Sequence, residues 1–138
     1  MADANPYRGL TYAQSLDRLV ERWGEREALA FGGRRWTFRE VRDEVERASA
    51  RLAGLGLAPG DKVAIWMPNR PEFLWTWLGA SRMGLVAVFL NTRLREEEFV
   101  YQIAQSDARV VVVPGAGAFR DLLGDLVAVC PELRTGAP

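Results

Sequence analysis

Two arginines, Arg93 and Arg95, are candidates for binding a negatively charged ligand. They lie in the turn 91–95, which follows an apolar run of strand length and precedes a helical pattern. The carboxyl ends of parallel strands are where α/β proteins bind ligands, and arginine forms charge-assisted hydrogen bonds to phosphate. The alternative, that both are ordinary exposed arginines, stays open at this point.

A second candidate is the glycine pair Gly115-x-Gly117, which follows an apolar segment and opens another helical pattern. Glycines in a strand-to-helix loop let backbone N–H groups approach a phosphate at the helix N-terminus. The dinucleotide fingerprint needs a third small residue where this chain has Arg120, and no acidic strand end follows. We therefore interpret the loop as an ordinary turn and keep a small nucleotide-binding protein as an alternative function.

The remaining reactive side chains indicate no catalytic centre. The chain has no histidine, which removes the usual general base, and its one cysteine, Cys130, has no partner for a disulfide. Glu96, Glu97 and Glu98 are consecutive, so on a helix they point about 100° apart and do not converge on a metal. They are typical of a solvated helix start, where the helix dipole favours anions.

Charge and hydropathy exclude two further classes of function. The 18 basic and 18 acidic residues leave no net charge, whereas electrostatic nucleic-acid binding needs a basic surplus. The longest apolar run, residues 73–90, is interrupted by Arg82 and Gly84, so we expect a buried helix and strand rather than a membrane span. The absence of a basic and apolar leader predicts a cytoplasmic protein.

Capping residues and apolar spacing predict a helix–hairpin–helix preface. Thr11 and Gln14 form a capping box before an apolar helical pattern, and Gly32–Gly33 is a hairpin signal. Thr37 and Glu40 form a second capping box, which opens an amphipathic helix of about 17 residues.

Beyond the preface, three apolar segments alternate with helical patterns. The expected strands are Lys62–Met67, Leu85–Leu90 and Arg109–Val113, and the last helix is expected over Phe119–Val129. Continuous Val- and Ile-rich strands separated by helices are typical of buried parallel strands. The expected fold class is α/β, a preface followed by a three-stranded parallel βαβαβα unit. Residues 1–10 are expected to be a flexible lead-in, 11–130 a single domain and 131–138 a tail that packs on no other element.

The five tryptophans are expected mainly to pack the core. Trp75 and Trp77 lie two residues apart in a helical pattern, so they must face different sides, and one of them is expected to face a partner. The full set is Trp23, Trp36, Trp66, Trp75 and Trp77.

The ordered series of elements resembles a known family. Residues 60–113, from GDKVAIWMPNRP to ARVVVV, closely resemble the start of the AMP-forming acyl-CoA synthetases, which belong to the adenylate-forming superfamily. Residues 28–61 resemble the hairpin, threonine-capped helix and turn that precede that segment in the family. The resemblance implies the amino-terminal portion of the large domain of a ligase of fatty acid metabolism. Such a ligase adenylates a carboxylate with ATP and Mg²⁺, then forms a thioester with coenzyme A.

The resemblance also implies roles for particular residues. Arg93 matches a turn arginine that lies near the coenzyme A nucleotide in some members, so it is expected to contact a coenzyme A phosphate. The family's phosphate loop is not found here, and Lys62 does not match the catalytic lysine. The chain is therefore expected to hold no cofactor or catalytic residue itself and to be inactive alone. Two positions depart from the family pattern: Phe89 replaces a usual proline, and Arg95 replaces a Ser or Thr helix cap.

We therefore expect an amino-terminal fragment whose main partner is the remainder of the enzyme. An uncovered surface at Trp75, at Trp77 or at a sheet edge would then lead to self-association. The alternative is a standalone, non-catalytic α/β interaction module, which would be monomeric or form a defined dimer.

Overall fold

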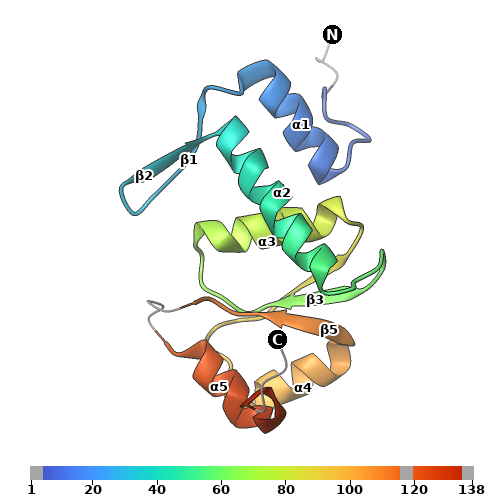
Figure 1. Cartoon of the computed structure of the whole chain (residues 1–138), viewed down its shortest axis with the longest axis vertical. Helices are drawn as coiled ribbons and strands as arrows, with labels where there is room; N and C mark the ends of the chain where they lie inside the picture. Colours follow the sequence, from blue (N-terminus) through green and yellow to red (C-terminus); the bar gives the residue numbers. More distant parts are fainter. Residues whose placement is uncertain (1–4, 116–119, 135–138) are drawn as a thin grey trace.

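The computed structural model describes residues 5–115 and 120–134 as stacked layers of helices around a small parallel sheet (Figure 1). The preface consists of α1 (Tyr12–Trp23), the hairpin strands β1 (Glu27–Phe31) and β2 (Arg34–Thr37), and α2 (Phe38–Gly54). The sheet unit follows in the order β3 (Lys62–Ile65), α3 (Pro71–Arg82), β4 (Val86–Phe89), α4 (Glu96–Ser106), β5 (Ala108–Val112) and α5 (Leu122–Val129).

Both predicted capping boxes open the helices of the preface. The Thr11 hydroxyl accepts a hydrogen bond from the Gln14 N–H (3.2 Å), and the Gln14 side chain accepts one from the Thr11 N–H (2.9 Å). The same reciprocal pair joins Thr37 and Glu40 at 3.2 and 2.8 Å. Each pair satisfies backbone donors that a helix start otherwise leaves without partners. The predicted helix length of 17 residues is confirmed in α2.

The three strands of the predicted unit form a parallel sheet in the order β4-β3-β5. The central strand carries Val63, Ala64 and Ile65, none of which is exposed. Burial on both faces explains why this strand is continuously apolar rather than alternating. The α/β fold with a helix–hairpin–helix preface and a three-stranded parallel unit is therefore confirmed.

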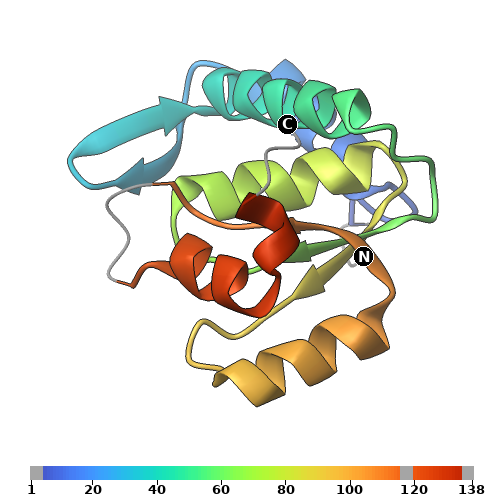
Figure 2. The same cartoon turned by 60° about the horizontal axis from the view of Figure 1, so that its bottom comes forward.

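Helices cover both faces of this sheet, so that it lies between α3 and the pair α4 and α5 (Figure 2). On the α3 side, Val63 packs with Ala80 and Leu85, and Leu52 of α2 joins the same cluster. On the opposite side, the Trp66 ring stacks on Phe99 of α4, with ring centroids 4.0 Å apart. The apolar cluster on that side consists of Ala64, Trp66, Leu90, Phe99, Leu122 and Leu126.

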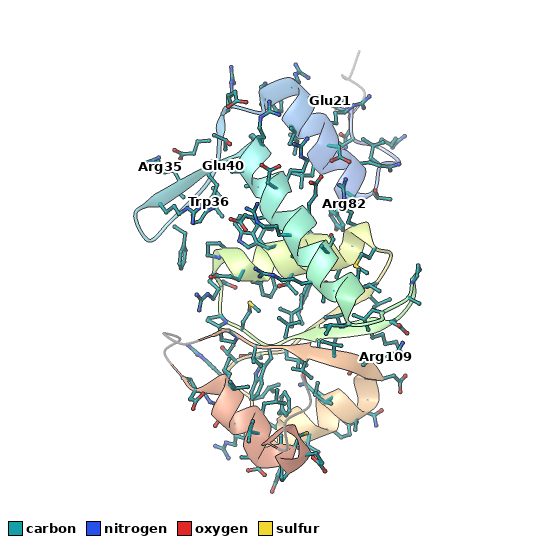
Figure 3. The ribbon with its side chains drawn as sticks, in the orientation of Figure 1. Glu21, Arg35, Trp36, Glu40, Arg82 and Arg109 are labelled. Atoms are coloured by element: carbon teal, nitrogen blue, oxygen red, sulfur yellow. The ribbon has the colours of Figure 1, made fainter. Side chains whose placement is uncertain are left out.

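Arg82, which interrupts the longest apolar run, lies at the end of α3, where it joins three helices (Figure 3). Its guanidinium lies 3.2 Å from the carboxylate of Asp17 in α1 and 3.6 Å from that of Glu46 in α2. Gly84 follows with φ at +71°, a conformation that ends the helix and favours glycine. Among the described residues, no helix is long and apolar enough to cross a membrane.

The last part of the chain differs from the sequence prediction in two ways. The helix expected from Phe119 begins at Leu122, because the Asp121 side chain caps it by accepting a hydrogen bond from the Gly124 N–H at 2.9 Å. Phe119 itself lies outside the described residues. Pro131–Arg134, at the start of the expected tail, form a short 3-10 helix, η1, which directly follows α5.

Candidate functional site

The turn 91–95 lies where predicted, between the carboxyl end of β4 and the start of α4. The Asn91 side chain accepts a hydrogen bond from the Arg93 N–H (2.9 Å), and the Asn91 carbonyl accepts one from the Leu94 N–H (3.2 Å). The indole of Trp66, which is 2% exposed, also donates to the Asn91 carbonyl at 3.1 Å. The buried tryptophan therefore fixes the first residue of the turn to the end of the central strand.

Arg120 holds the other half of the turn. Its guanidinium donates to the carbonyls of Thr92 (2.9 Å) and Leu94 (3.2 Å), and to the Asp125 carboxylate (2.6 Å). It also lies over the Trp66 ring, 5.8 Å from the centroid. The planar fork of arginine suits this arrangement because it directs several N–H groups at separate acceptors. Arg120, which stands where the dinucleotide fingerprint needs a small residue, therefore holds the turn that carries the candidate arginines.

The side chains of the two candidate arginines take no part in these contacts. Arg93 and Arg95 are exposed, and within the described part of the chain neither guanidinium has a hydrogen bond or ion pair to a carboxylate. The backbone N–H of Arg95 donates to the Glu98 carboxylate at 2.8 Å. The helix start therefore relies on this glutamate rather than on a Ser or Thr cap, as the sequence predicts.

The glutamate triplet does not form an acidic site. Glu96, Glu97 and Glu98 are all exposed in the first turn of α4, and one of them is used as the cap. Within the described ranges, no group of three His, Cys, Asp or Glu side chains could hold a metal ion. The interpretation of the triplet as a solvated helix start is confirmed.

A shallow hollow of about 490 Å³ opens beside the turn, at the carboxyl ends of β3 and β4. Its lining combines apolar rings with amide and hydroxyl groups, and the residues are Met67, Pro68, Asn69, Phe73, Phe89, Leu90, Asn91 and Thr92. The adjacent Arg70 is already paired with Glu72 at 2.7 and 3.0 Å, which lowers the pKa of that carboxyl. Arg93 directly follows Thr92, the last lining residue, and has no ion pair among the described residues.

Two other charged residues lie at the opposite, amino end of the sheet. Lys62 pairs with Asp107 at 2.9 Å, so it belongs to a surface ion pair. Arg109 pairs with Asp61 near the start of β5 (Figure 3). The pKa of Asp61 is lowered, first by the hydrogen bond from the Ala58 N–H and then by Arg109.

Two further candidates carry no site in the described residues. Gly115 lies in an open loop with no atom near the position of a Cβ, whereas Gly117 lies outside the described residues. Cys130 is a free, half-buried thiol at the C-cap of α5.

The tryptophans divide between the core and one surface. Trp36 and Trp75 are buried and contact each other edge to face, with centroids 5.9 Å apart. Trp77 is only half-buried and contacts the rings of Tyr12 and Phe89. The prediction that Trp75 and Trp77 face different sides is confirmed, and Trp75 does not contribute to an uncovered surface.

Comparisons with known proteins give a consistent result. The family model described as AMP-binding enzyme matches residues 16–135. The mitochondrial medium-chain acyl-CoA ligase ACSF2 of Danio rerio is 31% identical over 98% of this chain, and the long-chain fatty acid transport protein 1 of Bos taurus is 40% identical over 84%. The inhibitor-bound crystal structure of the N-terminal domain of FACL13 from Mycobacterium tuberculosis is 28% identical, with a TM-score of 0.75, over 93% of this chain and 30% of its own. The chain spans 23% and 19% of the two curated relatives.

Proposed function

Because the chain belongs to the AMP-binding enzyme family, whose model matches residues 16–135, we propose that it acts as the amino-terminal part of an AMP-forming acyl-CoA synthetase. The whole protein would join a carboxylic acid to coenzyme A in two steps. ATP first converts the carboxylate into an acyl-adenylate with release of pyrophosphate. The thiol of coenzyme A then displaces AMP to give the thioester.

The observation that supports a role for this chain is the fixed turn at the carboxyl end of β4. The carbonyls of Asn91, Thr92 and Leu94 are all held by buried or half-buried side chains, while Arg93 extends into solvent without an ion pair to any described residue. Because the turn backbone is already held, binding at Arg93 orders the arginine side chain but not the turn that carries it. Arginine is suited to phosphate because it can donate two parallel hydrogen bonds.

Coenzyme A is the ligand proposed here, since its phosphate groups suit the Arg93 guanidinium and the adjoining hollow offers apolar surface. When bound, coenzyme A supplies the thiol that accepts the acyl group. In this proposal Arg93 binds a phosphate of coenzyme A, and the contacts of Trp66 and Arg120 keep the turn in place. In this proposal ATP and Mg²⁺ bind to other parts of the synthetase.

The proposal is tested by titrating the ¹⁵N-labelled chain with coenzyme A and recording amide chemical shifts. We expect saturable shifts centred on residues 91–95 that are lost in Arg93→Ala. Arg95→Ala is the matched control, because this arginine is also exposed and lies two residues away, and it should retain the shifts. Absence of shifts, or equal loss in both variants, would remove Arg93 from the proposed site.

Three finer assignments belong to the same proposal. A role in fatty acid metabolism follows from the names of the relatives, and the identity of the acid would be read from acyl-CoA products. A cytoplasmic location remains a prediction that cell fractionation tests. The chain alone is expected to show no ATP–pyrophosphate exchange above background.

A further inference from the structure

Strand β4 forms one edge of the sheet, and its outer side has no strand partner among the described residues. The strand reads VAVF, without a charged residue or proline. Phe89 is 52% exposed and Val86 is 47% exposed. Natural sheet edges are usually protected by charge, proline, a bulge or a covering element, since an open edge can pair with another strand.

The backbone of β4 shows which groups are available at this edge. Val86 and Leu90 donate to the carbonyls of Asp61 (2.9 Å) and Ile65 (3.1 Å) on the central strand side. Because successive residues of a strand direct their N–H and C=O groups to opposite sides, those of Ala87 and Phe89 face outward. Two donors and two acceptors are therefore presented in one short row.

The opposite edge, formed by β5, carries two protective features at its start. Its pairing with β3 contains a register shift near its start, and Arg109 lies at that position with its guanidinium on Asp61. A bulge and a charged side chain are two of the devices that prevent edge pairing. The two edges of the sheet therefore differ, and β4 is the one that lacks both features along its whole length.

Aromatic rings continue the exposed surface beside β4. Phe89 contacts Phe73 and Trp77 of α3, with centroids 5.1 and 5.9 Å apart, and Trp77 contacts Tyr12 at 5.2 Å. Tyr12 is 61% exposed. This aromatic row lies on the α3 side of the edge, so a strand added to β4 would also cover apolar surface.

We propose that the β4 edge pairs with the same edge of a second copy of this chain, antiparallel across a two-fold axis centred on Val88. In this register Ala87 of one copy faces Phe89 of the other, so that all four outward N–H groups of the two copies meet outward carbonyls. Phe89 and Ala87 lie on the same face of the strand, so each large ring meets a small side chain. The pairing is self-complementary, and no charge on either strand opposes it.

The association is tested in the absence of coenzyme A, because Phe89 also lines the hollow beside the proposed contact, although Arg93 and Arg120 supply none of the pairing groups. Its test is the molar mass of the purified chain by sedimentation equilibrium over a range of concentrations, together with amide exchange at Ala87 and Phe89. We expect a monomer–dimer equilibrium. Protection of both amides should rise with protein concentration.

Substitutions at the β4 edge distinguish association through backbone hydrogen bonds from non-specific hydrophobic association. Phe89→Pro removes one outward N–H per copy without removing a bond to β3, and we expect the dissociation constant to rise at least thirtyfold, since about two hydrogen bonds are lost. Phe89→Ser keeps the N–H and should weaken the dimer about tenfold through lost apolar contact. Leu55→Ser is the matched control because Leu55 is similarly exposed (55%) beside the β5 side of the sheet, and it should leave the dimer unchanged.

Circular dichroism melting of each variant shows that it is folded, and amide exchange on the unsubstituted chain provides a reading that needs no variant. A chain that stays monomeric at about 1 mM would overturn the proposal. In that case the β4 edge would be covered by another segment of a synthetase rather than by a second copy of this chain. A dimer in which the Phe89 amide exchanges freely, or in which Phe89→Pro has no effect, would overturn it equally.

Discussion

Replacing Arg120 is the sharpest test of whether its hydrogen bonds hold the turn 91–95 in place. In Arg120→Ala the carbonyls of Thr92 and Leu94 lose their donor, and the Asp125 carboxylate loses its ion-pair partner. A hydrogen bond to a charged group contributes about 1.5–3 kcal/mol where water is excluded. The Arg120 side chain is 34% exposed, so water replaces part of these contacts, and we expect a total loss of about 2 kcal/mol.

That loss has two measurable consequences. For a chain of this size the melting temperature should fall by roughly 6–8 °C. The amide of Leu94, which donates to the Asn91 carbonyl within the turn, should exchange about thirtyfold faster through local opening. Arg120→Lys should recover only part of the loss, because an ammonium group cannot reproduce the planar fork.

Arg8→Ala is the control, since Arg8 is an exposed arginine far from the turn in sequence and has no ion pair among the described residues. It should change neither the melting temperature nor the exchange of Leu94. If Arg120→Ala behaves like this control, the turn is not held by Arg120. The argument that a rigid turn presents Arg93 would then be refuted.

Three further predictions concern the fold that supports the site. Gly79→Ala should destabilise the protein by about 1 kcal/mol in urea unfolding, because a Cβ would lie 3.0 Å from the Ser49 backbone nitrogen in α2 and the overpacking exceeds the gain in helix propensity. Asp61 has a lowered pKa in the folded state, so its contribution is present above its ordinary pKa of 3.8 and is lost as pH falls through the lowered value. Asp61→Asn should therefore flatten the acid limb of the stability profile. Trp66→Phe should keep stacking on Phe99 but lose the bond to the Asn91 carbonyl, which speeds exchange in the turn without unfolding the sheet.

Local sequence signals predicted the fold well because most of its elements are specified locally. Reciprocal capping pairs at Thr11 and Thr37 define helix starts within four residues, and the 3-4 spacing of apolar residues defines the buried side of α2. The apolar character of Val63–Ile65 reflects burial on both faces, which only the central strand of a covered sheet experiences. In each case the sequence signal and its physical cause lie within one element.

The position of the turn could be predicted from sequence, but the contacts that hold it could not, because they are not local. The turn containing Arg93 was found from its position after a strand. The hydrogen bonds of Arg120, however, reach Leu94 and Thr92, which precede it in the chain by 26 and 28 positions. Nothing in the neighbourhood of Arg120 indicates that its side chain turns toward another loop. The open edge at β4 is similarly a property of strand order, which the sequence of one strand does not contain.

The most direct test of the central claim is a chimera in which residues 16–135 replace the matching segment of the full-length Danio rerio relative. The measurement is the rate of acyl-CoA formation as a function of coenzyme A concentration. The account predicts a folded, active ligase in which Arg93→Ala raises the KM for coenzyme A about tenfold or more and changes kcat little, since one charge-assisted phosphate contact is lost. An active chimera whose KM for coenzyme A is unaffected by Arg93→Ala would contradict the proposed contact, and a folded chimera without ligase activity would contradict the assignment of this chain to a working synthetase.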